Sequence, residues 1–254
     1  MPLSSSDRFL GRVETYAKFR PSYPSAAIDL LEARCGLKPG AVAVDLGSGT
    51  GILSALLLKR GARVFGIEPN REMRYYSDLA LSGEFYSDSG TAENTYMPDG
   101  FFDLLVAGQA FHWFDPQRTR VEALRILKPG AWAALLWNER PKGLVPFLED
   151  YEALLRRYAP EYDAVAQLRA QEDGISRFFG RKPELATFAN RQVLDFDGLA
   201  GRVMSASYAP MPGRPEHEPL MAGLREVFDR HQQDGKVVFP YETLVYFGQP
   251  GASA

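Results

Sequence analysis

Short apolar runs alternate with helix-like segments through the first half of this chain. The apolar runs are 3–7 residues long and turn residues bound them, which predicts buried strands. The predicted strands are residues 42–44, 63–68, 84–87, 102–107 and 131–137. The segments between them carry helix formers and helix starts, such as Asp115-Pro116. Strands that alternate with helices predict an α/β fold with a doubly wound, mostly parallel sheet.

The pattern changes after residue 138. Residues 144–182 hold charged, helical stretches at 147–158 and 162–171 without a strand pattern. A sixth strand is predicted at 192–196 and a seventh at 237–247, with helices at 197–205 and 216–232. The prediction is a single domain over 1–254, divided into four parts. These are an N-terminal segment (1–24), a core (25–138), a helical insertion above the carboxyl ends of the strands (139–185) and C-terminal elements that complete the sheet (186–254).

The N-terminal segment is rich in aromatic residues around two prolines. Two interpretations are open. The segment packs its aromatic side chains on the core, or it forms a lid that supplies Tyr16 and Arg20 to a substrate.

Charge and composition exclude several classes of protein. The net charge of -3 provides no basic footprint for DNA or RNA. No apolar run approaches the roughly 20 residues of a membrane span, and the first residues lack the pattern of a signal peptide. Cys35 is the single cysteine, which excludes an internal disulfide and a cysteine-built metal site. A cytoplasmic protein without a metal, nucleic-acid or membrane partner is expected.

A glycine turn follows the first strand. Gly47, Gly49 and Gly51 alternate there with Ser48 and Thr50 before a predicted helix. Glycine is needed where the backbone takes positive φ or approaches a ligand closely, and a helix N-terminus after such a turn is typical of nucleotide-type cofactor sites. A dinucleotide fingerprint has a different spacing, G-x-G-x-x-G.

Two acidic residues narrow the choice of cofactor class. Asp45 precedes the glycines, where it is unfavourable for a pyrophosphate but suits a cationic ligand such as a sulfonium amino acid. Glu68 closes the second predicted strand, about 20 residues further on, where a carboxylate can accept both ribose hydroxyls.

In these residues the chain resembles the class I S-adenosylmethionine-dependent methyltransferases, whose first motif is similar to residues 44–51. The resemblance implies a Rossmann-like fold of seven strands and S-adenosyl-L-methionine as cofactor. It also implies cofactor contacts by Asp45, Gly47, Ser48, Gly49, Gly51, Glu68, Pro69, Thr91, Ala92, Glu93 and Gln109. The family more often has an acidic residue where Thr91 stands.

Residues 108–115 form an aromatic segment after the fourth strand, with His112 and Trp113 at its centre. This segment, the Arg-Pro-Ser-Tyr-Pro entry at 20–24 and the Ser-Ala-Ser-Tyr-Ala-Pro segment at 205–210 resemble small-molecule methyltransferases of the trans-aconitate type. Tyr16, Arg20, His112 and Trp113 are the predicted substrate-binding residues. With an ordinary pKa near 6.5, His112 can serve as the catalytic base, or it can merely bond its own loop.

The predicted function is methyl transfer to the oxygen, nitrogen or carboxyl group of a small organic molecule. Two alternatives remain: a protein of this fold that binds S-adenosylmethionine but catalyses another reaction, and an NAD(P)-dependent oxidoreductase, which the glycine spacing disfavours. The oligomeric state stays open.

Overall fold

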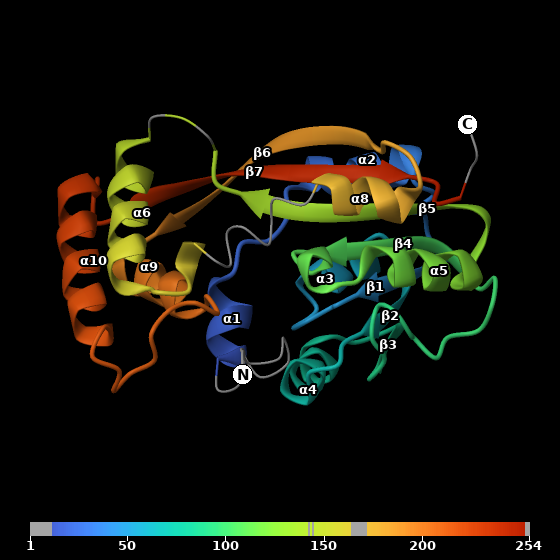
Figure 1. Ribbon diagram of the computed structural model, residues 1–254, viewed down its shortest axis with the longest axis horizontal. Helices are drawn as coiled ribbons and strands as arrows, with labels where there is room; N and C mark the ends of the chain where they lie inside the picture. Colours follow the sequence, from blue (N-terminus) through green and yellow to red (C-terminus); the bar gives the residue numbers. More distant parts are fainter. Residues whose placement is uncertain (1–11, 142, 144, 164–171, 252–254) are drawn as a thin grey trace.

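The computed structural model describes residues 12–141, 143, 145–163 and 172–251. Seven strands form one sheet in the order β3-β2-β1-β4-β5-β7-β6 (Figure 1). The strands are β1 (Val42–Leu46), β2 (Arg63–Ile67), β3 (Phe85–Asp88), β4 (Phe102–Gly108), β5 (Leu127–Glu139), β6 (Glu184–Leu194) and β7 (Val237–Gly248). The first five are parallel, and β7 runs antiparallel to both β5 and β6. The predicted α/β, mostly parallel seven-stranded sheet is confirmed.

Alternating side chains of the central strands pack against helices on both faces of the sheet. On one face, Ala43 of β1 lies in a core with α2 (Ser25–Arg34) and α3 (Ile52–Lys59). On the other face, Val44 lies in a core with α5 (Pro116–Ile126) and α8 (Glu172–Phe179). A strand buried on both faces reads as a continuous apolar run, which is why the sequence revealed these strands so clearly.

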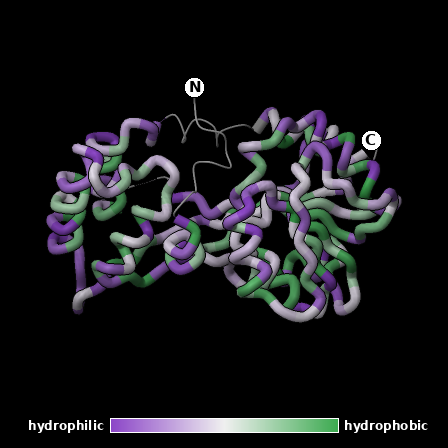
Figure 2. Tube along the Cα trace, turned by 90° about the horizontal axis from the view of Figure 1, so that it is seen from below, coloured by the Kyte–Doolittle hydropathy of each residue, from purple (hydrophilic) through white to green (hydrophobic). Residues whose placement is uncertain are grey.

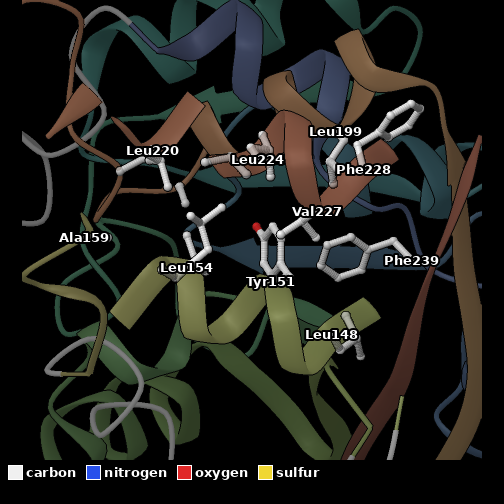
Figure 3. Close-up of a cluster of buried hydrophobic side chains, with 14 of the residues drawn as sticks. Leu148, Tyr151, Leu154, Ala159, Leu199, Leu220, Leu224, Val227, Phe228 and Phe239 are labelled. Atoms are coloured by element: carbon white, nitrogen blue, oxygen red, sulfur yellow. The ribbon is translucent and has the colours of Figure 1, made fainter. Parts of the chain in front are cut away.

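A third core lies at the far end of the long strands. Helices α6 (Pro146–Tyr158), α9 (Phe196–Met204) and α10 (His217–His231) pack there around the ends of β6 and β7. Tyr151 of α6 is fully buried in the middle of this cluster, beside Phe239 of β7 (Figure 3). We call these three helices the cap, which forms a lobe of its own beside the sheet (Figure 2).

Helix α1 (Val13–Phe19) connects the cap with the sheet lobe (Figure 1). It packs on α9 of the cap and also touches α4 (Arg71–Ala80), which follows β2. Among the described residues, no helix combines the length and the apolar character that crossing a bilayer requires.

Several element boundaries differ from the sequence prediction. Strand β6 was predicted over 192–196 but begins at Glu184, because an edge strand with a polar outer face lacks a continuous apolar run. Phe196 belongs to α9 instead, because the Asp195 carboxylate accepts a hydrogen bond from the Gly198 N–H and starts a helix. Strand β5 begins at Leu127, which pairs with Phe102, where a helix was predicted to continue to residue 130.

The predicted insertion also divides differently. Of the two helices assigned to the described residues within 139–185, α6 belongs to the cap, whereas α8 packs on α5 against the sheet. Within 186–254, α9 and α10 join the cap and only the strands complete the sheet. The helix predicted at 162–171 lies largely outside the described residues, as do residues 1–11 of the predicted lid segment.

Candidate functional site

A cleft opens at the carboxyl ends of β1 and β4. Strand β1 lies between β2 and β4, so the order of the sheet reverses at this point, and ligands of doubly wound sheets bind at such a switch point. The cleft is lined by Tyr16, Arg20, Pro21, Tyr23, Asp45, Gly47, Ser48, Gly49, Thr50, Ile52, Leu53, Gly108, Gln109, Asn138 and Arg202. The predicted cofactor residues Asp45, Gly47, Ser48, Gly49 and Gln109 therefore meet the predicted substrate residues Tyr16 and Arg20 in one cavity.

The glycine turn between β1 and α3 has the backbone shape that requires glycine. Gly47, Gly49 and Gly51 have φ angles of 65°, 57° and 82°. A Cβ on Gly47 would lie 2.6 Å from the Cβ of Ala110 in the loop after β4. A Cβ on Gly51 would lie 2.6 Å from Cδ1 of Leu81, at the end of α4. Gly47 thus brings the loop after β4 to the cleft, whereas Gly51 lies outside the cleft lining and lets α4 approach.

Glu68 is held against this turn. Its Oε2 accepts a hydrogen bond from the Gly49 N–H at 2.9 Å, and its Oε1 accepts one from the Asn70 N–H at 2.8 Å. Burial raises the pKa of the carboxyl, while these two backbone donors oppose the shift. The carboxylate is thereby fixed beside the turn with lone pairs to spare, although Glu68 is not itself among the lining residues.

Asp45 is a fully buried carboxyl at the base of the cleft. Its Oδ2 accepts a hydrogen bond from the Ser54 hydroxyl at 2.7 Å, and its Oδ1 has no partner among the described residues. Burial raises its pKa to about 7, and the negative charge of Glu68 adds to the shift. Ser48 Oγ and Thr50 Oγ1 likewise have no hydrogen-bond partner among the described residues. Buried polar groups are normally satisfied, so these three atoms indicate a polar ligand.

Side chains of the sheet hold the chain after α1 over the cleft. The Asn138 and Asn190 amides both donate to the Ser22 carbonyl, at 3.2 and 2.8 Å. The Gln192 amide donates to the Phe19 carbonyl at 3.1 Å. These bonds fix the segment that carries Arg20, whose guanidinium donates to the Ser205 carbonyl at 2.8 Å in the cap.

Gln109 closes the cleft on the β4 side. It has a φ of 56°, rare for a residue other than glycine, and its amide donates to the Asn138 carbonyl at 3.0 Å. Strained backbone of this kind concentrates at functional sites. Asn138 and Arg202 also line the cleft and were missed by the sequence analysis.

Five predicted residues lie outside the cleft lining, in addition to Glu68 and Gly51: Pro69, Thr91, Ala92, Glu93 and Trp113. Glu93 accepts a hydrogen bond from the Asp115 N–H at 2.8 Å, at the start of α5. Ala92 is buried, whereas Pro69 and Thr91 are exposed. Their contacts with a cofactor stay predictions.

His112 also lies outside the lining. It sits on a single 3₁₀ turn, Phe111–Trp113, with its ring 4.7 Å from that of Trp113. Its role as a base stays a prediction. Among the described residues, no group of three or more His, Cys, Asp or Glu side chains is arranged to hold a metal ion.

Residues 44–135 match the family model described as "Methyltransferase domain". This part of the chain is similar to a methyltransferase domain. It begins in β1 and ends in β5, so the domain match includes the glycine turn, Glu68 and the loop after β4. The predicted resemblance to S-adenosylmethionine-dependent methyltransferases is confirmed.

Proteins that are similar to this chain in sequence are also named methyltransferases. An uncharacterized methyltransferase of Mycobacterium tuberculosis is 38% identical over 136 residues, which is 54% of each chain. The trans-aconitate 2-methyltransferase of Azoarcus sp. is 34% identical over 125 residues, 48% of each chain. An uncharacterized methyltransferase of Schizosaccharomyces pombe is 28% identical over 92% of this chain and 93% of its own. The alignments with the first two relatives thus span about half of their length.

Two solved structures share the fold. A proposed type II methyltransferase from Anaeromyxobacter dehalogenans superposes with a TM-score of 0.67 at 21% identity, over 91% of this chain and 98% of its own. The YcgJ protein of Bacillus subtilis superposes with a TM-score of 0.55 at 18% identity, over 89% and 99% of the two chains.

The methyltransferase family implies S-adenosyl-L-methionine as cofactor, and the cleft fits this group. A cationic sulfonium and ammonium suit the acidic base formed by Asp45 and Glu68. The unpartnered oxygens of Asp45, Ser48 and Thr50 are hydrogen-bond acceptors or donors that a polar ligand would satisfy. Gly47, Ser48 and Gly49 of the glycine turn line the cleft beside these oxygens.

Proposed function

We propose that this protein transfers the methyl group of S-adenosyl-L-methionine to a small organic acceptor. The observation that carries the proposal is the cleft at the switch point, where the glycine turn, Asp45 and Gln109 meet Tyr16 and Arg20 of the covering segment. The domain match at 44–135 supports the same reaction.

The bound cofactor supplies an electrophilic methyl group on a positively charged sulfur. The residues of the chain have a positioning task. Asp45 and the glycine turn hold the donor, Gln109 limits its movement on the β4 side, and the segment around Arg20 excludes water. Aligning two reactants in this way accounts for a large part of the rate enhancement in transfer reactions.

A small acceptor is proposed because the cleft is closed by the cap and by the segment 16–23, which leaves a bounded space. Tyr16 and Arg20 are the proposed acceptor contacts, and His112 is the proposed base for an acceptor hydroxyl. A cytoplasmic location and the lack of nucleic-acid and membrane partners remain predictions of the sequence.

The test has two stages. Calorimetric titration of the purified protein with S-adenosyl-L-methionine and S-adenosyl-L-homocysteine measures cofactor binding, with NADH and NADPH as controls. Incubation with candidate acceptors is then read by mass spectrometry as the gain of one methyl group. No binding of either sulfur nucleoside would reject the proposal. Binding without transfer to any acceptor class would favour the alternative of a different reaction on the same cofactor.

His112 is tested separately. With a methyl acceptor that carries a hydroxyl, H112A is expected to slow turnover by about 10²–10⁴-fold while the cofactor affinity is unchanged. Equal turnover of H112A and the wild type across the pH range would make His112 a structural residue of its loop.

A further inference from the structure

Arg202 is a buried cation that lines the candidate active site. It lies on α9, its exposed fraction is 7%, and it is one of the residues that line the cleft. Its Nε donates to the Tyr241 hydroxyl at 2.9 Å. Its Nη1 is buried and has no hydrogen-bond partner in the described part of the chain.

Two other arginines of this region, the buried Arg12 and the half-buried Arg140, are compensated. Arg12 donates to the carbonyl of Met204, at the end of α9, and to those of Ala206 and Ala209 just beyond it, with 2.7 Å to the last of them. Arg140 forms an ion pair with Glu152, with 2.9 Å between Nε and Oε1. No carboxylate of the described residues pairs with Arg202 in this way, and the titratable groups that act on it are all tyrosines, which are neutral at physiological pH: Tyr241, Tyr151 and Tyr208.

A chain of hydrogen bonds sets the orientation of Arg202. The guanidinium can only donate, so the Tyr241 oxygen accepts, and the Tyr241 hydroxyl then donates to Gln192 Oε1 at 2.8 Å. The Gln192 amide donates in turn to the Phe19 carbonyl. Because Nε is engaged in this chain, the terminal nitrogens are the part of the fork that remains for a ligand in the cleft.

Aromatic rings stabilise the charge only in part. The guanidinium carbon lies 5.6 Å from the ring centre of Phe239 and 5.8 Å from that of Tyr241. Such contacts contribute less than an ion pair with charge-assisted hydrogen bonds. A buried charge without a counter-charge is costly, and a ligand that brings the missing anion would remove this cost.

We propose that Arg202 is the anchor of an anion subsite in the acceptor cavity, so that the methyl acceptor carries a carboxylate or phosphate group. The planar guanidinium fork matches either group. This inference rests on the proposed function. It assigns Arg202 to recognition of the acceptor, whereas Asp45 and the glycine turn, at the acidic end of the same cleft, serve the cofactor.

The first test measures binding of matched probes to protein saturated with S-adenosyl-L-homocysteine. The probes are acetate and acetamide, benzoate and benzamide, and phenyl phosphate, observed by ligand-detected NMR. We expect at least one anion to bind ten or more times tighter than its neutral counterpart. Benzamide is the neutral counterpart of both benzoate and phenyl phosphate. This preference should vanish in R202M and be weakened in R202K, which keeps the charge without the fork. The control R157M removes an exposed positive charge from the cap and should keep the preference.

Several outcomes overturn the inference. One is a wild type that binds no anion better than its neutral counterpart, and another is a preference that survives in R202M. A third is a loss of S-adenosyl-L-homocysteine affinity of tenfold or more in R202M, which would assign Arg202 to the carboxylate of the cofactor. Cofactor binding by the wild type is measured first, so failure of the proposed function appears there and not in the probe series.

The second test needs no ligand. If Arg202 is uncompensated, R202M should not lower the Tm of the free protein, because an apolar side chain replaces a buried charge. R140M is the control, and its Tm should fall, because Glu152 loses the less exposed of its two arginine partners and keeps only Arg156. An equal fall in both variants would show that Arg202 is satisfied in the free protein and would overturn the inference.

Discussion

Glu68 Oε2 accepts a hydrogen bond from the backbone N–H of Gly49, with 2.9 Å between the two atoms. The bond joins the end of β2 to the glycine turn after β1. The second oxygen is bonded to the Asn70 N–H at the start of α4. One carboxylate thus ties three segments of the cleft together and remains able to accept further hydrogen bonds.

Replacement of Glu68 should weaken cofactor binding. We expect E68A to lose about 1.5–3 kcal/mol of S-adenosyl-L-methionine affinity, which is roughly a tenfold to 150-fold rise in Kd, because a charged acceptor is removed. Calorimetric titration measures this loss. E68Q keeps the shape and one carbonyl acceptor, so its loss should be smaller. Unchanged affinity in a folded E68A protein would contradict the role.

The raised pKa of Asp45 predicts a dependence of stability on pH. Its pKa of about 7 in the folded state exceeds the ordinary 3.8, so between these values the folded protein holds a proton that the unfolded chain has lost. The free energy of unfolding of the wild type should therefore fall as the pH rises through this window. D45N carries no such group. Between pH 5 and 8, the wild type should lose about 2–3 kcal/mol relative to D45N, measured by urea denaturation. Parallel curves for the two proteins would refute the shift.

Gly47 and Gly40 form a matched pair for the glycine turn. Both have positive φ angles, 65° and 80°, but a Cβ on Gly47 would collide with Ala110 at 2.6 Å, whereas a Cβ on Gly40 has no atom within 4 Å. G40A should cost about 1–2 kcal/mol for backbone strain alone. G47A should cost more than G40A and should also abolish cofactor binding, because the loop after β4 is displaced. Similar stabilities, with binding retained in G47A, would contradict the close approach.

Gly201 accommodates the ring of Phe19 where α1 meets the cap. A Cβ on Gly201 would lie 2.3 Å from Cδ2 of this ring. G201A should therefore destabilise the protein by about 1–3 kcal/mol through overpacking. Because the obstacle is the Phe19 side chain, F19A should relieve much of this cost, giving a coupling energy above about 0.5 kcal/mol in a double-mutant cycle of urea denaturation. Additive effects would place the two residues out of contact.

The core strands were predictable because each is buried on both faces. Residues 102–107, for example, read as an apolar run and form most of β4. Strand β6 was predicted only near its end, since its side chains alternate between partly buried and exposed positions along most of its length. The pairing of β6 with β7 joins segments that are about 50 residues apart. No local pattern in the sequence predicts such a partner.

The same contrast holds for the site. Asp45, Gly47 and Gln109 were predicted from their places after strands, and the adjacency of β1 and β4 brings them into one cleft. The sequence analysis missed Arg202. This residue lies on the buried face of α9 together with Leu199, three residues before it, and Val203, the residue after it. A lone arginine among the apolar positions of a short helix was the available signal.

By itself, the sequence determined the parallel sheet, the glycine turn and the acidic residues beside it, because strand burial and positive φ angles are properties of short segments. Only the tertiary structure decided which helices form the cap and that Arg202 faces the cleft. These features depend on how α6, α9 and α10 pack around the ends of β6 and β7. Packing of this kind depends on the shape and charge of helix surfaces whose residues are far apart in the sequence. A local sequence pattern therefore does not predict it.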